Sequence, residues 1–167
     1  MKSPALKFAG ILLLGLFAFY GLNAQSTNPV TESVLKTAKS QISNFTRDLP
    51  ESDLASYGFN NRTEFEKIGF GDPIPVYTLK DSVVVFTSTW RVPLVIEGEY
   101  RSLLTVIEAD GQYKAVDFGA SELARAYAAG KTPETSGMLR VYELHKDYFI
   151  QGREKSNQTF IPIEFKK

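Results

Sequence analysis

The apolar residues are distributed in three ways along the chain: an unbroken run at the start, then a helical spacing, then a long series of strand-like runs. The first run covers residues 8–20 and follows two lysines. At about 1.5 Å per residue it makes about 20 Å of helix, short of the ~30 Å hydrocarbon core of a bilayer. Because Ala24 and polar residues follow, the pattern is typical of a secretory signal peptide. We expect residues 1–24 to be cleaved; an uncleaved membrane anchor or a buried core helix is the alternative.

An amphipathic helix is predicted directly after the leader. Asn28 is a suitable N-cap and Pro29 a suitable first helical residue. Apolar residues then recur with the helical period as far as Thr46, and polar residues lie between them. These apolar positions are Val34, Leu35, Ala38, Ile42 and Phe45. We expect this helix to cover a sheet, with binding to a membrane surface as the alternative. A second, short helix is predicted from Asn61 to Ile68, since Asn61 to Glu64 resemble a capping box.

The rest of the chain is dominated by runs rich in β-branched and aromatic residues, which predict strands. Asp110-Gly111 favours a tight hairpin turn, and Gly98 favours another. Connections this short cannot carry parallel crossovers, so we expect antiparallel pairing, with Pro93 at an edge or a bulge. A helix is predicted at about 120–129, where the period returns to 3.6. The predicted strands are 74–79, 83–89, 91–96, 100–107, 112–118, 138–144, 147–151 and 159–165.

These elements predict an α+β fold: a curved antiparallel β-meander of about six to eight strands, with the N-terminal amphipathic helix and the helix at 120–129 packed on one face. Residues 25–167 are of a length that suits a single soluble domain. The chain contains no cysteine, so we expect this domain to be held by its hydrophobic core without disulfides. An exported protein without disulfides fits a bacterial envelope, in the periplasm or outside the cell.

The charge of the chain argues against some classes of partner. Removing the leader removes two lysines and no acid, which leaves 17 Lys and Arg against 19 Asp and Glu, a net charge of −2. Charges this balanced and interspersed give no electrostatic footprint for nucleic acid or for an anionic membrane surface. We therefore expect neither as a partner, and no stable membrane span after cleavage of the leader.

Few residues carry the patterns that catalysis or cofactor binding requires. His145, the only histidine, falls in a connection between two predicted strands, where we expect an exposed turn residue; a general base is the alternative. Glu97 and Glu99 flank a turn glycine and are expected to be solvated, with a hydrolase acid pair or a calcium site as alternatives. No nucleotide-binding glycine motif occurs. We expect no catalytic site, no metal and no cofactor.

The aromatic content indicates a binding surface. The chain has one Trp, eight Tyr and twelve Phe, most of which are expected in the core. Trp90-Arg91 and Tyr100-Arg101 lie on strands predicted to be adjacent, and aromatic and guanidinium groups together can grip a peptide or line a pocket. We therefore expect Trp90, Arg91, Tyr100 and Arg101 to bind a ligand or partner.

The sequence thus predicts an exported, non-catalytic binding module. Its expected partner is a protein or peptide of the cell envelope, recognised through a sheet edge or the concave sheet face. One alternative is a carrier of a small apolar ligand in a cavity between the sheet and the helices. Another is a hydrolase that uses His145 or the Glu97 and Glu99 pair.

Overall fold

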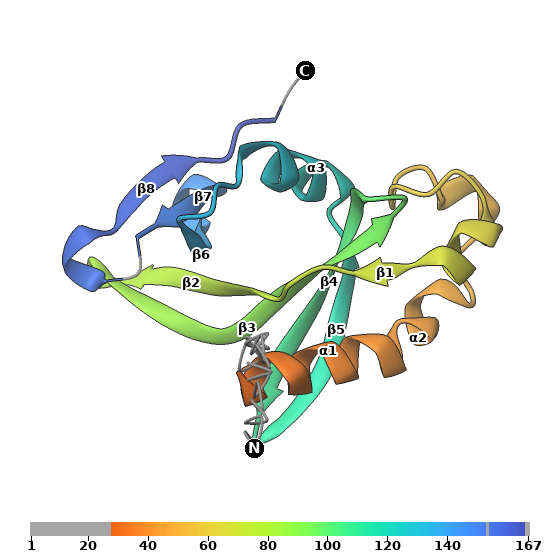
Figure 1. The fold of residues 1–167 in the computed structure, drawn as a ribbon, viewed down its shortest axis with the longest axis horizontal. Coiled ribbons are helices and arrows are strands. Elements are labelled where there is room, and N and C mark those ends of the chain that lie inside the picture. Colours follow the sequence, from red (N-terminus) through yellow and green to blue (C-terminus); the bar gives the residue numbers. More distant parts are fainter. Residues whose placement is uncertain (1–27, 153, 166–167) are drawn as a thin grey trace, which may run out of the picture.

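An eight-stranded sheet with helices packed against it forms an α+β fold in the computed structural model, which describes residues 28–152 and 154–165 (Figure 1). The predicted leader, residues 1–24, lies outside the described residues. The strands are β1 (Gly69–Phe70), β2 (Ile74–Lys80), β3 (Val83–Ile96), β4 (Glu99–Ala109), β5 (Gln112–Gly119), β6 (Thr135–Val141), β7 (Lys146–Gln151) and β8 (Thr159–Pro162). The α-helices are α1 (Pro29–Gln41), α2 (Ser43–Thr46) and α3 (Ser121–Gly130). Four short 3-10 helices are η1 (Glu51–Asp53), η2 (Arg62–Lys67), η3 (Tyr142–Leu144) and η4 (Lys155–Asn157).

The predicted N-terminal helix is confirmed. Asn28 caps it, because its side-chain oxygen accepts a hydrogen bond of 3.0 Å from the backbone N–H of Val30. Val34 and Ala38 are fully buried in the core beneath the helix, as the apolar period predicts. After Ile42 the chain continues into the single turn of α2. Within residues 28–152 and 154–165, no helix is long and apolar enough to cross a membrane.

The short helix predicted from Asn61 is the 3-10 helix η2, and its predicted cap is absent. The side chain of Asn61 makes no capping hydrogen bond and instead accepts one of 2.6 Å from the Thr63 hydroxyl. Glu64 accepts from the backbone N–H and the side-chain amide of Asn60, each at 2.8 Å. The carboxylate therefore satisfies the backbone one residue before the position that a capping box would use.

The sheet is mixed, which corrects the expectation of an all-antiparallel meander. Its strand order is β5-β4-β3-β2-β6-β7-β8, with β1 paired to β3 off this path. All pairs are antiparallel except β2 and β6, which are parallel with Val76 opposite Met138. The connection between β5 and β6 contains α3, so it is long enough to cross the sheet. The tight hairpins predict antiparallel neighbours, whereas this one long connection allows a parallel pair.

Helices cover both faces of the sheet, whereas the sequence predicted both helices on one face. In the register of β3 and β4, Val92 lies opposite Leu104, and both belong to the core that α1 covers. Leu103, the neighbour of Leu104, points to the other face and packs with Tyr127 of α3. The sequence reflects this arrangement, because residues 103 and 104 are both apolar although they point to opposite faces of the sheet. Figure 1 shows α1 and α3 on different sides of β3 to β5.

Pro93 is buried inside the sheet rather than at an edge, and it lies one residue before the register shift between Leu94 and Val95. On one side of β3, Pro93 pairs with Leu103 of β4. On the other side, it lies between Leu94, which pairs with β1, and Arg91, which pairs with β2. The backbone N–H of Gly71, in the segment that joins β1 to β2, donates to the Pro93 carbonyl at 2.8 Å. The missing N–H of proline therefore falls where no strand needs it.

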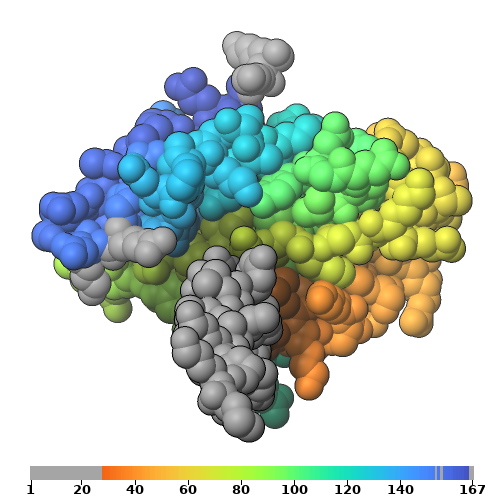
Figure 2. Space-filling view, in the orientation of Figure 1, coloured from red at the N-terminus to blue at the C-terminus, as the bar shows by residue number. Residues whose placement is uncertain are grey.

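The C-terminal strands extend the sheet away from the helical segments that begin the described chain. In the space-filling view, the blue residues of β7 and β8 lie at the end opposite residues 50–70 (Figure 2). At the junction, the space between α3 and the sheet is filled by Leu103, Ala124 and Met138, which are almost completely buried.

Candidate functional site

The four residues predicted to form one binding surface do not come together. Trp90 and Arg91 are consecutive on β3 and point to opposite faces. Trp90 is buried in the core beneath α1, and its ring contacts those of Phe86 and Tyr113 at centroid distances of 5.0 and 5.6 Å. Tyr100 pairs with Val95, five residues further along β3 than Trp90. The hairpin register thus separates the two aromatic-arginine pairs.

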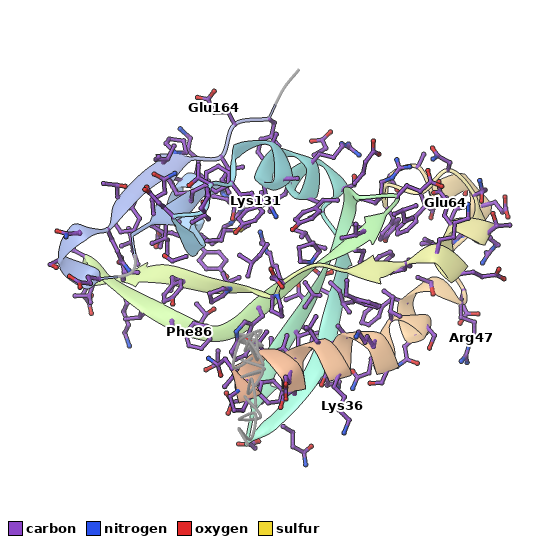
Figure 3. All side chains as sticks on the ribbon, in the orientation of Figure 1. Lys36, Arg47, Glu64, Phe86, Lys131 and Glu164 are labelled. Atoms are coloured by element: carbon purple, nitrogen blue, oxygen red, sulfur yellow. The ribbon has the colours of Figure 1, made fainter. Side chains whose placement is uncertain are left out.

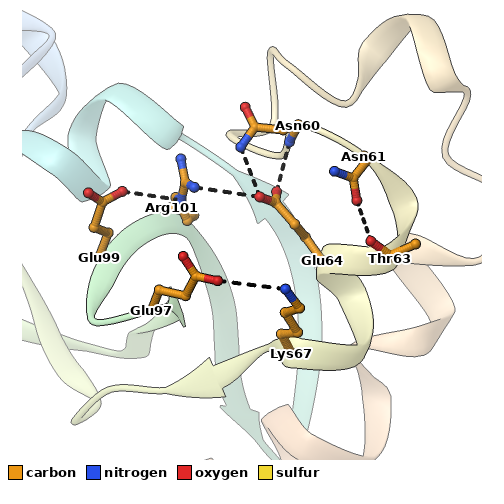
Figure 4. Close-up of polar contacts among 8 residues, drawn as sticks. All are labelled: Asn60, Asn61, Thr63, Glu64, Lys67, Glu97, Glu99 and Arg101. Carbon is orange, nitrogen blue, oxygen red and sulfur yellow. Dashed lines mark hydrogen bonds and ion pairs between the residues drawn. The ribbon is translucent and has the colours of Figure 1, made fainter.

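Arg101 belongs to a group of ion pairs near the turn of the β3–β4 hairpin (Figure 4). Its guanidinium lies 3.6 Å from Glu64 and 3.5 Å from Glu99. The backbone N–H of Asn60 lowers the pKa of Glu64 against the opposing effect of burial, with further lowering by the Asn60 side chain and by the Arg101 and Lys67 charges. These contacts fix η2 onto the sheet, so Arg101 is engaged in structural pairing.

The residues considered for catalysis lie at turns. His145 is exposed and takes a left-handed backbone conformation between η3 and β7, which confirms its predicted place in a turn. Glu97 is exposed and lies 3.6 Å from Lys67, while Glu99 pairs with Arg101 (Figure 4). In the part of the chain that the structure describes, no three His, Asp or Glu side chains are placed to hold a metal ion.

Arg91 lies in a buried charge cluster on the face opposite Trp90. Asp147 is 4% exposed, and its Oδ2 accepts from Arg140 at 2.6 Å. Its Oδ1 lies 3.5 Å from Arg91 and has no hydrogen-bond partner within the described residues. Burial lowers the pKa of Arg91, and the charge of Asp147 opposes that shift. Since Arg91 is on β3 and the other two residues are on β6 and β7, the cluster ties the C-terminal strands to the centre of the sheet.

A pocket of about 430 Å³, which we call the rim pocket, opens where α3 ends beside β2 and β6. Its walls come from the loop before β2, the start of β4, the end of α3, the following loop and the start of β6. The parallel pairing of β2 and β6 is what brings these segments together. The lining residues are Asp72, Pro73, Ile74, Pro75, Tyr100, Tyr127, Lys131, Thr132, Pro133, Thr135, Ser136 and Gly137.

Tyr100 and Lys131 form one wall of the rim pocket. The Lys131 ammonium donates a hydrogen bond of 2.6 Å to the Tyr100 hydroxyl and lies 4.5 Å from the centre of its ring. A cation this close to a tyrosine ring is attracted by the ring's negative face. Gly130 allows the chain to leave α3 here, because a Cβ at this position would lie 2.7 Å from the buried ring of Phe149. Figure 3 shows Lys131 beside α3, far from Glu64.

Tyr127 supplies a second phenol to the rim pocket. Its side chain leaves α3 on the face that packs against the sheet, is 6% exposed, and contacts the ring of Phe149. Its hydroxyl makes no hydrogen bond to residues 28–152 and 154–165 and is not one of their buried polar atoms that lack a partner, so it opens into the pocket. Burial raises the pKa of Tyr127, and Tyr100 and Asp72 raise it further. The phenol is therefore a protonated donor at physiological pH, available to a ligand.

Of the rim-pocket residues, sequence reasoning identified Tyr100 alone. Tyr127 and Lys131 lie in and directly after the helix predicted at about 120–129, and the periodicity that predicts this helix does not mark the polar end of either side chain as part of a site. The signal for the site is the parallel approach of β6 to β2, and no local pattern in the sequence encodes that approach.

The two outer strands of the sheet are each partly blocked against a further strand. On β5, the backbone N–H of Ala115 donates to the Gln41 side chain of α1 at 2.9 Å. Next to β8, the backbone N–H of Ile163 donates to the backbone carbonyl of Asp147. Because backbone N–H groups alternate in direction along a strand, the backbone of Ile161 also faces β7, and the backbone nitrogen of Pro162 faces outward. A proline has no N–H to offer an added strand. Such protection is a common device against edge pairing, and it disfavours a partner that binds by strand addition.

One exposed apolar surface lies on the hairpin of β2 and β3. Leu79, Val83 and Phe86 are each more than a third exposed there. Phe86 also contacts Tyr77 and Trp90, so it is anchored to the core. This hairpin surface is the main rival to the rim pocket as a binding site.

Comparisons with protein-family models, with curated proteins and with solved structures give no match to this chain. The function is therefore argued from the geometry of the chain itself.

Proposed function

We propose that this protein is an exported, non-catalytic module that recognises a peptide segment of a cell-envelope protein, and that the peptide binds in the rim pocket. The observation that carries this proposal is the Tyr127 hydroxyl, which opens into the pocket next to the Lys131 and Tyr100 pair and makes no hydrogen bond within the described chain. An acceptor on a ligand could form a hydrogen bond with this hydroxyl.

The shape and chemistry of the rim pocket suit a peptide. Its volume of about 430 Å³ lies within the range of small ligand sites and would hold one or two peptide residues. Its walls combine two tyrosines with three prolines, Pro73, Pro75 and Pro133. Rigid apolar walls of this kind, with a few polar groups among them, are common where extended peptides dock.

A carrier of a small apolar ligand is supported less well. The space between α3 and the sheet, where such a ligand was expected, is filled by buried side chains, among them Leu103 and Met138. The rim pocket itself contains Lys131, Asp72 and several hydroxyls, which an apolar ligand would leave unpaired. The blocked strand edges likewise favour a pocket over strand addition.

Export is the second part of the proposal. It is supported by the leader pattern of residues 1–24. The intact mass of protein recovered from the envelope or medium of the source bacterium tests it. A chain that begins at Gln25 supports export with cleavage, and a membrane-embedded chain that retains Met1 contradicts it.

A capture experiment tests binding at the rim pocket. The exported protein is immobilised and incubated with envelope extract, beside the variant Tyr127→Phe/Lys131→Met and two controls: Lys36→Met on α1 and Phe86→Ser on the hairpin surface. We expect a partner protein that the wild type and both controls retain, and that the pocket variant retains at about one tenth of that level or less. Circular dichroism of all four proteins checks that each variant is folded.

Three results would contradict the proposal. The first is equal capture by the pocket variant, and the second is a partner lost only from Phe86→Ser. The third is a small apolar molecule, seen by native mass spectrometry, that co-purifies with the wild type and is lost from the pocket variant, because this result supports a carrier.

A further inference from the structure

We propose that the rim pocket recognises a carboxylate group of its ligand, held by the Tyr127 hydroxyl, the Tyr100 hydroxyl and the Lys131 ammonium. This inference rests on the proposed function and adds the chemical group that the peptide presents. Two peptide groups have this chemistry, the C-terminal carboxylate and the side chain of aspartate or glutamate.

The hydrogen-bond directions at the rim pocket leave donors facing the ligand. An ammonium can only donate, so in the 2.6 Å contact the Tyr100 oxygen is the acceptor. The Tyr100 proton is therefore free to donate elsewhere, and Lys131 retains two further protons. The Tyr127 hydroxyl adds a third source. Three neighbouring groups with protons to donate match a carboxylate, which is an acceptor at both oxygens.

The charges of the rim pocket allow one carboxylate and require a nearby donor on the same ligand. Among the described residues that line the pocket, Lys131 is the one cation and Asp72 is the one acid. Asp72 is exposed, on the loop before β2, and it raises the pKa of Tyr127 through its charge. A carboxylate paired with Lys131 would be repelled by Asp72 unless a ligand N–H also faced Asp72. A peptide meets both needs, because each of its carboxylates lies close to a backbone amide.

The buried position of Tyr127 separates this arrangement from an ordinary surface lysine. A surface Lys131 alone would attract any anion weakly, since water screens exposed charges. Only 6% of the Tyr127 side chain is exposed, whereas Lys131 is exposed, so a ligand atom that bonds the Tyr127 hydroxyl would lie deeper in the pocket than one that meets Lys131 alone. Charge-assisted hydrogen bonds in such places are shorter and stronger than neutral ones. Tyr127 should therefore provide discrimination between a carboxylate and a neutral amide of the same shape.

Nuclear magnetic resonance titrations of the isotope-labelled exported protein test the inference. The probes are sodium acetate and acetamide, which have nearly the same shape, at constant ionic strength. We expect acetate to shift the backbone signals of Tyr127, Lys131 and Thr132, with at least about tenfold weaker binding of acetamide. Tyr127→Phe and Lys131→Met should each weaken acetate binding about five- to tenfold. Lys36→Met, on the exposed side of α1, should leave it unchanged.

Peptide probes then distinguish the two sources of the carboxylate. The compounds are N-acetyl-prolyl-alanine with a free C-terminus, its C-terminal amide, and N-acetyl-aspartyl-alanine amide. Tighter binding of the first identifies a C-terminal carboxylate, and tighter binding of the third identifies an acidic side chain. Either result supports the inference.

The inference is overturned if acetate and acetamide shift the same signals with equal affinity, or if acetate shifts no rim-pocket signal. It is also overturned if Tyr127→Phe and Lys131→Met bind acetate as the wild type does. These results would leave the capture experiment unaffected, since a partner could still require the pocket for its shape. Loss of carboxylate recognition and loss of the proposed function are therefore separate outcomes.

Discussion

Among the described residues, charged side chains are buried only where neighbouring groups compensate for the charge. Glu64 is buried and receives two hydrogen bonds from Asn60, with Arg101 at 3.6 Å. Asp147 Oδ1 and Arg101 Nε are the buried side-chain polar atoms of the described residues that lack a hydrogen-bond partner, and each lies 3.5 Å from an opposite charge. The rule that buried polar groups need partners accounts for the structural role of Glu64.

The substitution Glu64→Gln should destabilise the protein in a pH-dependent way. The folded-state pKa of Glu64 lies below the ordinary value of 4.5, so its carboxylate stabilises the fold above that pH, and this contribution disappears as the pH falls through the lowered pKa. We expect a loss of about 1–2 kcal/mol at pH 7, measured by urea unfolding, and a smaller loss below pH 4. Glu99→Gln, at the exposed partner of Arg101, should cost less than about 0.5 kcal/mol. An equal cost of Glu64→Gln at both pH values would contradict the assignment.

Two glycines with left-handed backbones allow the cost of backbone strain to be compared with the cost of a steric clash. Gly58 has φ of +91°, and a Cβ there would lie 2.1 Å from the Arg101 carbonyl oxygen. Gly111 has φ of +73°, with nothing within 4 Å of its Cβ position. Gly111→Ala should therefore cost about 1 kcal/mol for the backbone alone, and Gly58→Ala at least about 3 kcal/mol, by urea unfolding. Similar costs for the two variants would show that the segment at Gly58 can move away from β4.

At the scale of elements, the sequence predicts what is local and misses what depends on distant contacts. The cap at Asn28, the helix near 120–129 and the hairpin strands were predicted, because each follows from residues close together in the chain. The parallel pairing of β2 with β6 joins residues about 60 positions apart, as between Val76 and Met138. Turn residues and periodicity hold no information on that contact. For the same reason, Arg91 was identified as a binding residue although it pairs with Asp147.

The charge cluster at Asp147 should matter more for stability than exposed ion pairs do. Asp147→Asn would leave Arg91 and Arg140 facing each other on β3 and β6 without a counter-charge. We expect a loss of about 2–3 kcal/mol in urea unfolding, less than for a fully buried pair because both arginines are partly exposed. Lys67→Met, which removes an exposed pair with Glu97, should cost less than about 0.5 kcal/mol. Equal costs would mean that the cluster does not hold the C-terminal strands.

At the scale of the whole molecule, the fold leaves few places for a partner to bind. Helices cover both faces of the central strands, and the two outer strands are partly blocked, at Ala115 and at Pro162. The rim pocket and the hairpin surface around Phe86 remain as the main candidates. The fold class could be predicted from the sequence, but the site could not, because its walls come from separate segments that only the chain crossing after β5 brings together.

Photo-crosslinking in intact cells tests the central claim most directly. A photoreactive amino acid is placed at Thr132 on the rim pocket, at Phe86 on the hairpin surface, or at Lys36 on α1, in otherwise unchanged protein. Binding at the rim pocket predicts a crosslink to one envelope protein from position 132, which Tyr127→Phe in the same chain weakens, and none from the other two positions. A crosslink to that protein from position 86 or 36, with none from 132, would contradict it.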